Sequence, residues 1–170
     1  NPRHQQAIRR LVQRMGEGMI WSSRLFAAQS GVLRSPGQLA RYCWHVLGTP
    51  VLFAEEIQRL DQGLPVEVSD TRLRSCASIG EVIQLANITR DLEKDCARGI
   101  YYHPDLPGAN GVQREQRIRQ VRSQLVLRAL RLSAEICPFV ESIPAPRISL
   151  ARGGAVLMVL ATHAYYRRAC

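Results

Sequence analysis

The chain has 170 residues, of which 46% are hydrophobic and 22% charged, a composition that excludes a wholly disordered protein. Its net charge of +9 comes from 23 basic and 14 acidic residues, and the only lysine is Lys94. Because the arginines are spread along the chain and no nucleic-acid-binding motif accompanies them, we do not expect a nucleic-acid partner.

Helical spacing dominates the sequence, and a first helix is expected over residues 3–29. Its apolar residues recur with the spacing of one buried stripe, at Ile8, Leu11, Val12, Met15, Met19 and Leu25. Gly16 and Gly18 interrupt this helix, and each costs about 1 kcal/mol relative to alanine in a helix interior. They predict either a kink or the close approach of another group.

A second helix should begin at Ser35 and Pro36, which suit an N-cap and a first-turn proline. The sequence at residues 48–50, Gly-Thr-Pro, should break or bend it, because proline removes a backbone donor. The helix should then continue to residues 63–65, where a glycine and a proline end it.

A third helix is expected to start at Ser69 or Asp70, either of which can cap it, and to end at Gly99. After a loop at residues 100–111, a fourth helix should cover residues 112–136 and end near Pro138.

The last predicted helix covers residues 148–168 and follows a proline-containing linker at residues 144–146. Its apolar run, residues 155–161, is shorter than the roughly 18 residues of a membrane-spanning helix, so we expect a buried core helix. Together these helices predict an all-α fold that forms one domain over residues 1–170.

The cysteines indicate a reducing compartment. There are five of them, Cys43, Cys76, Cys96, Cys137 and Cys170, and no two form a CxxC pair. An odd number without such pairs predicts reduced, mostly structural thiols. No apolar signal-peptide core is visible either, so we expect a cytoplasmic protein.

The most informative feature is a polar stripe on the third predicted helix. At about 100° per residue, its members fall within an arc of about 80°; they are Gln84, Asn87, Asp91, Asp95 and Arg98. Asp91 and Asp95 are one turn apart, and like charges at that spacing destabilise a helix by a few tenths of a kcal/mol. Two interpretations follow, a solvated face in which Asp95 pairs with Arg98 or Arg90, or a site that binds a cation.

Magnesium fits the second interpretation, because Mg²⁺ prefers oxygen ligands and takes one or two protein carboxylates together with substrate phosphates. Asn87 lies one turn before Asp91 and could add a carbonyl oxygen. In this interpretation Asn87, Asp91 and Asp95 would be the metal ligands, and Tyr42, Asn87 and Asp91 would border an enclosed pocket.

Three ordered segments resemble motifs of the squalene/phytoene synthase family. Residues 15–19 read MGEGM, residues 42–49 read YCWHVLGT, and residues 84–95 read QLANITRDLEKD, followed by a glycine turn and a Tyr-x-Pro at residues 102–104. The end of the last predicted helix, residues 163–167, is similar to the closing helix of that family.

The resemblance implies an isoprenoid-synthase-type helical bundle that joins two prenyl diphosphates, farnesyl or geranylgeranyl, head to head. It implies Mg²⁺ as cofactor, with NADPH if the product is squalene, although no Gly-rich dinucleotide fingerprint is present. The implied catalytic residues are Tyr42, Asp91 and Asp95, and the implied substrate-binding residues are Gln84, Asn87, Arg90 and Tyr166.

The chain also departs from the family pattern. The first aspartate motif of the family is not found in residues 1–40, so we expect it on helices that precede residue 1 or on a partner chain that covers their place. Leu47 and Ile100 replace the family's alanine and arginine. The alternative function is therefore a catalytically inactive member that acts as a binding or assembly scaffold, and uncovered apolar faces would favour peripheral membrane contact.

Overall fold

The structure, a computed structural model, describes residues 1–67, 69–142, 162, 164–166 and 168. Every regular element that it contains in these residues is a helix, which confirms the all-α prediction. The elements are α1 (Pro2–Ala28), α2 (Pro36–Cys43), the π-helical turn η1 (Trp44–Gly48), α3 (Thr49–Asp61), α4 (Asp70–Ala97) and α5 (Gly111–Ser142).

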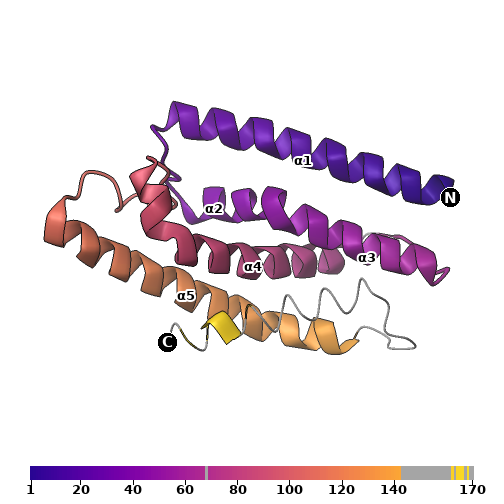
Figure 1. Cartoon of the computed structure of the whole chain (residues 1–170). Coiled ribbons are helices and arrows are strands. Elements are labelled where there is room, and N and C mark those ends of the chain that lie inside the picture. The colour runs from indigo at the N-terminus through magenta and orange to yellow at the C-terminus, as the bar shows by residue number, and fades with distance from the viewer. Residues whose placement is uncertain (68, 143–161, 163, 167, 169–170) are drawn as a thin grey trace.

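Helix α1, the α2–η1–α3 segment, α4 and α5 follow one another across the bundle in this order (Figure 1). Each of these four runs in the opposite direction to the one before it. Helix α1 packs against α3 and η1, whereas α4 packs against α2, η1, α3 and α5. Helix α4, which carries the polar stripe, therefore lies in the middle of the bundle.

Local capping explains where the helices begin. The Ser35 hydroxyl oxygen accepts a hydrogen bond from the backbone N–H of Gln38 at 3.2 Å, and Ser69 does the same for Arg72 at 3.3 Å. Of the two candidates for the cap of α4, Ser69 is thus the one that caps it. Beyond the end of α4, Gly99 has a φ of 77°, the left-handed conformation that glycine adopts without strain.

The predicted break near residues 48–50 is a π-helical turn that starts earlier, at Trp44. In this turn the backbone N–H of Thr49 donates to the carbonyl of Trp44, five residues before it. Pro50 does not end the helix, because it lies in the first turn of α3, where the missing N–H costs little.

Helix α1 is continuous, so Gly16 and Gly18 do not produce a break in it. The second explanation, close approach of another group, holds for Gly18. A Cβ atom on Gly18 would lie 2.5 Å from the Cβ of His45, whereas one on Gly16 would have no neighbour within 4 Å.

The prediction that Pro138 ends the fourth helix was wrong, because α5 continues to Ser142. A proline inside a helix removes one backbone hydrogen bond and tends to kink the helix, but the turns on either side can keep it continuous. Most of the predicted last helix lies outside the described residues; its described positions, 162, 164–166 and 168, are helical.

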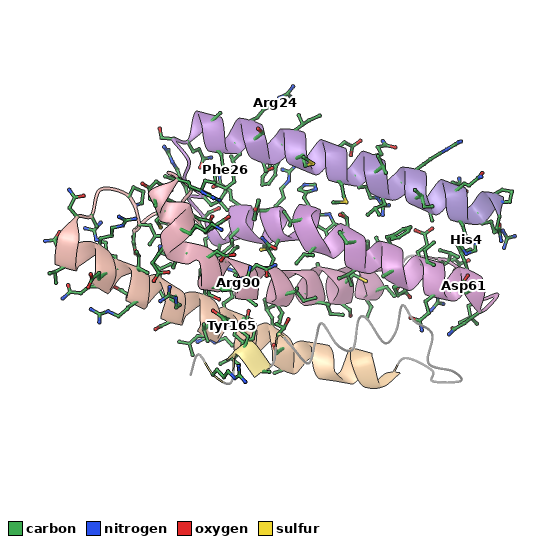
Figure 2. All side chains as sticks on the ribbon, viewed as in Figure 1. His4, Arg24, Phe26, Asp61, Arg90 and Tyr165 are labelled. Atoms are coloured by element: carbon green, nitrogen blue, oxygen red, sulfur yellow. The ribbon has the colours of Figure 1, made fainter. Side chains whose placement is uncertain are left out.

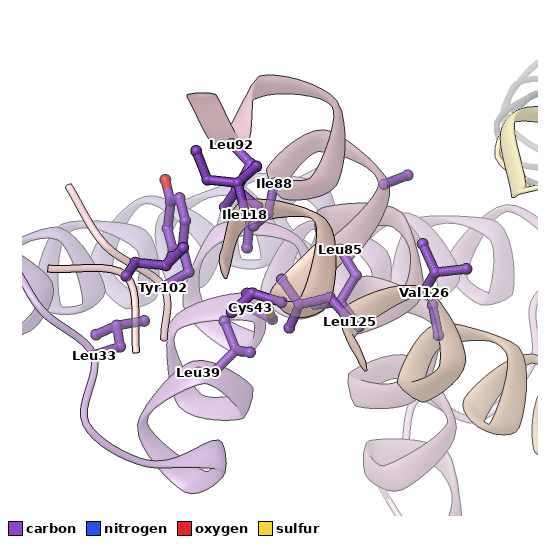
Figure 3. Close-up of a cluster of buried hydrophobic side chains, with 14 of the residues drawn as sticks. Leu33, Leu39, Cys43, Leu85, Ile88, Leu92, Tyr102, Ile118, Leu125 and Val126 are labelled. Carbon is purple, nitrogen blue, oxygen red and sulfur yellow. The ribbon is translucent and has the colours of Figure 1, made fainter. Parts of the chain in front are cut away.

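The hydrophobic core surrounds α4 (Figure 3). Leu85, Ile88 and Leu92 of α4 are almost fully buried, and each such side chain stabilises the fold by about 1.5–3 kcal/mol. They meet Leu39 and Cys43 from α2 and Ile118, Val121 and Leu125 from α5. Leu33 from the loop after α1 and Tyr102 from the loop after α4 complete the core around them.

The described cysteines, Cys43, Cys76 and Cys96, are free and buried, as predicted for structural thiols. Burial raises the pKa of Cys76 to about 12 and raises that of Cys43 further, so both thiols stay protonated. Among the helices of the described residues, none has the length and apolar character needed to cross a bilayer.

Candidate functional site

The polar stripe of α4 changes from buried to exposed along the helix. Gln84 is buried, Asn87, Asp91 and Asp95 are partly buried, and Arg98 is exposed. The Asn87 amide donates to the side-chain oxygen of Gln84 at 3.4 Å, so the two amides are held together. The stripe therefore starts in the packed interior and ends at the surface.

Three aromatic rings from different parts of the chain meet beside this stripe. We call Phe26 of α1, Tyr42 of α2 and Tyr102 of the loop after α4 the aromatic cluster. Phe26 packs edge-on against Tyr42 and Tyr102, with ring centroids 5.9 and 6.3 Å apart, and the two tyrosine rings lie 5.6 Å apart. Figure 2 shows Phe26 near the end of α1, on the side that faces α2.

Tyr102 connects the aromatic cluster to the stripe, because its hydroxyl donates to a carboxylate oxygen of Asp95 at 3.3 Å. Tyr102 was not among the site residues predicted from the sequence. The signal in the sequence was the Tyr-x-Pro at residues 102–104, but nothing in it shows that the chain turns back onto α4.

Two loops hold Tyr102 in this place. The backbone N–H of Tyr101 donates to the carbonyl of Gly31, and the N–H of Leu33 donates to the carbonyl of Tyr101, both at 2.8 Å. Gly31 has a φ of 82°, and a Cβ atom there would lie 1.9 Å from the carbonyl oxygen of Gly99. The loop after α1 and the loop after α4 can therefore pair closely only because position 31 is a glycine.

The two tyrosines of the cluster are neutral phenols at pH 7. Burial raises the pKa of Tyr42, and the charge of Asp95 adds to this, while hydrogen bonding with Tyr102 and Gln84 opposes it. Burial also raises the pKa of Tyr102 well above its ordinary value, with Tyr42 and Asp95 acting in the same direction. Both hydroxyls can therefore donate hydrogen bonds.

The two aspartates have different partners. The guanidinium of Arg90 donates to both carboxylate oxygens of Asp91, at 3.3 and 2.6 Å, and this lowers the pKa of Asp91. Asp95 accepts from Tyr102 instead. The solvated-face interpretation was therefore wrong about the pairing, since the ion pair that it predicted for Asp95 is formed by Asp91.

Tyr166 lies in the core. It is 2% exposed, and its hydroxyl donates to the backbone carbonyl of Val82 at 2.7 Å. The neighbouring Tyr165 donates to the hydroxyl of Thr89 at 3.0 Å. Both tyrosines join the end of the chain to α4, and neither hydroxyl is bonded to a member of the polar stripe.

The donor set of the stripe suits a magnesium ion that is shared with a ligand. Two carboxylates and two amides offer only oxygen among their metal-binding atoms, which is the ligand type that Mg²⁺ prefers. Among the described residues, no group of three or more His, Cys, Asp and Glu side chains is arranged to hold a metal ion. The stripe therefore suits a metal ion that takes its remaining ligands from the phosphate oxygens of a bound molecule.

An open depression of about 480 Å³ lies elsewhere, on α1, and is lined by Glu17, Ile20, Trp21, Arg24 and Leu25. The guanidinium carbon of Arg41 lies 4.4 Å above the Trp21 ring at this place. No member of the polar stripe lines this depression. The predicted pocket bordered by Tyr42, Asn87 and Asp91 stays a prediction.

The comparisons with known proteins identify the family. None of the curated proteins and none of the solved structures matches the chain. A family model, that of squalene/phytoene synthase, matches residues 2–169. Since the match covers nearly all 170 residues and the fold is helical, the chain belongs to the squalene/phytoene synthase family.

Proposed function

We propose that the chain takes part in the head-to-head condensation of two prenyl diphosphates. The observation that carries the proposal is the meeting of Tyr42, Tyr102 and Asp95 beside the amides of the polar stripe. This arrangement places neutral phenols and aromatic rings next to carboxylates, which is what a reaction of an apolar chain with a diphosphate end requires.

In the reaction, the C1–O bond of one prenyl diphosphate breaks and diphosphate leaves with the electron pair. The double bond of the second molecule supplies the electrons for the new carbon–carbon bond. Loss of a proton from the resulting cation closes a cyclopropane ring, which gives a cyclopropylcarbinyl diphosphate. The site must therefore bind diphosphate, stabilise a carbocation and accept a proton.

Diphosphate binding is assigned to the exposed half of the stripe. Asn87, Asp91 and Asp95 would hold Mg²⁺, which when bound neutralises diphosphate charge and makes it a better leaving group. Arg90 is more exposed than Asp91, with 59% of its side chain accessible, so its guanidinium can also meet phosphate oxygens.

Carbocation stabilisation is assigned to the aromatic cluster. A cation within about 6 Å of a ring centroid is stabilised by about 0.5–2 kcal/mol, and the three rings lie close enough together to act on one carbon chain. Because the raised pKa values keep Tyr42 and Tyr102 protonated, their rings stay uncharged. The Tyr42 hydroxyl can orient the leaving diphosphate, while the Tyr102 hydroxyl donates to Asp95.

Thermal unfolding with Mg²⁺ and a non-reactive prenyl thiodiphosphate tests the proposal. At a ligand concentration of about 100 times Kd, binding adds about 2.7 kcal/mol, which raises Tm by about 5–10 °C for a chain of this size. The variant Asp91→Asn should lose most of this rise, whereas Glu115→Gln, an exposed acid on α5, should keep it. A wild-type Tm that is unchanged by saturating ligand would overturn the proposal.

The second candidate function, a binding or assembly scaffold without catalysis, is favoured by Leu47 and Ile100, which replace family residues. The two functions differ in turnover. If the ligand raises Tm but prenyl diphosphates supplied with Mg²⁺ release no diphosphate, the scaffold function is supported and the condensation is excluded for this chain.

We also propose that α1 contacts a membrane surface. Ile8, Val12 and Met19 were predicted to belong to a buried stripe, but this prediction was wrong for them, because they are 49%, 65% and 69% exposed. Helical spacing places the three side chains within about 40° of one another, so they form one exposed apolar face. The net charge of +9 complements anionic headgroups. The chain should float with anionic vesicles, and Val12→Ser with Met19→Ser should abolish flotation; self-association without vesicle binding would point to a second copy of the chain instead.

A further inference from the structure

The π-helical turn η1 directly follows the segment that carries Tyr42. Such turns are rare and often occur at functional sites, because their hydrogen bonds are less favourable than those of an α-helix and need support from the surroundings. Here a second bond helps, since the Thr49 hydroxyl donates to the carbonyl of His45 at 3.1 Å. The remaining support comes from the two helices on either side of the turn.

On the α4 side, the support is direct contact between two backbones. A Cβ atom on Gly80 would lie 2.3 Å from the backbone nitrogen of Gly48 and 2.5 Å from its Cα. A backbone cannot move out of the way as the end of a long side chain can. Position 80 must therefore be a glycine if η1 and α4 are to keep their present distance.

On the α1 side, the support is a side chain. The His45 ring fills the space beside Gly18, where an added Cβ atom would lie 2.5 Å from its Cβ and Cγ. The His45 ring also contacts Trp21, with centroids 5.4 Å apart. The turn is thus held from both sides, by the backbone of α4 and by the contact of His45 with α1.

The contact between Gly80 and Gly48 lies close to the proposed site. Gln84 follows Gly80 by one helical turn, and Tyr42 precedes η1 by two residues. Cys43, between Tyr42 and the turn, is fully buried and links them through the backbone, so a displacement of η1 also displaces Tyr42. The distance between η1 and α4 therefore sets how close the Tyr42 side chain comes to Gln84.

We propose that Gly80 is a positioning residue, whose backbone contact with Gly48 holds Tyr42 beside Gln84 and within the aromatic cluster. Its relevance to catalysis rests on the proposed function, in which Tyr42 acts near the reacting carbons. The geometric part does not depend on any ligand. Gly80 itself touches no substrate and acts through Tyr42 alone.

The test is the titration of Tyr42, followed by NMR in protein labelled with ¹³Cζ-tyrosine and assigned with Tyr42→Phe. In Gly80→Ala the added methyl group should push η1 away from α4 and admit water to Tyr42. The titration midpoint of Tyr42 should then fall toward that of a free tyrosine, because burial is the largest cause of its raised pKa. Tyr165, bonded to Thr89 about two and a half turns further along α4 than Gly80, should keep its signal.

Gly16→Ala is the matched control, because it is also a glycine-to-alanine change inside a helix but meets no neighbour. It should leave the Tyr42 signal unchanged. The proposal is overturned if Gly80→Ala is folded and its Tyr42 titrates as in Gly16→Ala.

If Gly80→Ala does not fold, the double variant His45→Ala with Gly80→Ala replaces it. Removal of the His45 ring gives η1 room to move toward α1, so this variant should fold with a displaced Tyr42 signal, further from the wild type than that of His45→Ala alone. A wild-type Tyr42 signal in the double variant would overturn the proposal. Failure of both variants to fold would do so too, because the contact would then serve stability only. None of these outcomes depends on prenyl diphosphate binding, which the thermal-shift experiment tests separately.

Discussion

At one end of the bundle, where α1 and α4 begin and α3 ends, acidic side chains are paired with bases from other helices. Glu56 of α3 pairs with Arg10 of α1, and Glu55 pairs with Arg72 of α4. His4 and Asp61 form a third pair at 2.9 Å, at the far right of Figure 2. We call this region the ion-pair end.

At the other end, where α1 and α4 finish, the two aspartates do not join helices to one another. Asp91 pairs with Arg90, the residue next to it, and Asp95 accepts a hydrogen bond from Tyr102. This aspartate end is held together by the paired loops at Val32 and Tyr101 and by the aromatic cluster. Glu93, between the two aspartates, does join helices, because it pairs with Arg122 of α5. Asp91 and Asp95 themselves join no helices, which leaves them available to a ligand.

The largest effect of a substitution is expected at the ion-pair end. Arg10→Ala leaves the buried carboxylate of Glu56 without its partner, and breaking a buried pair costs about 3–5 kcal/mol. Because Arg10 is 38% exposed, we expect a smaller loss of about 2–3 kcal/mol in the free energy of unfolding, measured with urea.

Arg9→Ala is the control for this measurement, since Arg9 is exposed on the same helix and should change stability by less than about 0.5 kcal/mol. Replacing both partners, Arg10→Met with Glu56→Leu, should recover most of the loss, because no unpaired charge then stays buried. Equal effects of Arg9→Ala and Arg10→Ala would show that the pair does not join α1 to α3.

A second prediction concerns the region between the two ends. Burial lowers the pKa of His45, and Arg41 of α2 adds to this while Glu17 of α1 opposes it. The unfolded chain therefore binds a proton at this residue more readily than the folded chain does. The contribution of neutral His45 to stability is then fully present above the ordinary histidine pKa of about 6.5. It is lost as the pH falls from there toward the lower pKa that His45 has in the folded chain.

We accordingly expect a lower Tm at pH 5 than at pH 7.5, and a smaller difference between the two in His45→Phe, which keeps a ring beside Gly18 and Trp21. Fluorescence of the two tryptophans, Trp21 and Trp44, reports unfolding in this region. A variant that loses as much stability as the wild type on acidification would assign the pH dependence to other groups.

The sequence predicted those parts of the fold that depend on neighbouring residues. Ser35 caps α2 as expected, Ser69 caps α4 as one of the two candidates for that cap, and the turn at Gly99 follows α4. The polar stripe was also predictable, because helical geometry alone places Gln84 and Asp95 on one face.

What the sequence did not predict depends on residues that are far apart along the chain. The hydrogen bond from Tyr102 to Asp95 requires the loop at Gly31 to pair with Tyr101, and a local pattern carries no information about that pairing. The partner of Gly18 is His45, which only the packing of α1 against η1 reveals. A π-helical turn has no compositional signal of its own, so the sequence predicted only a break or bend at residues 48–50, beside the turn.

The smallest expected effect is at the aspartate end, and it is the sharpest test of the comparison. Asp95→Asn removes one of two like charges that are one turn apart, which should stabilise α4 by a few tenths of a kcal/mol. The amide oxygen of the asparagine can still accept from Tyr102, so little is lost in exchange. Glu56→Gln, at the ion-pair end, should instead destabilise the fold, because it leaves Arg10 without its charge partner.

If Asp95→Asn costs more than about 1 kcal/mol, Asp95 has a structural role like that of Glu56, and the distinction between the two ends fails. If stability is kept but the Mg²⁺-dependent rise in Tm with the thiodiphosphate is lost, the carboxylate serves ligand binding alone. The second outcome is the expected one, because the charge of Asp95 repels Asp91 until a cation binds, and the amide of asparagine can keep the hydrogen bond from Tyr102.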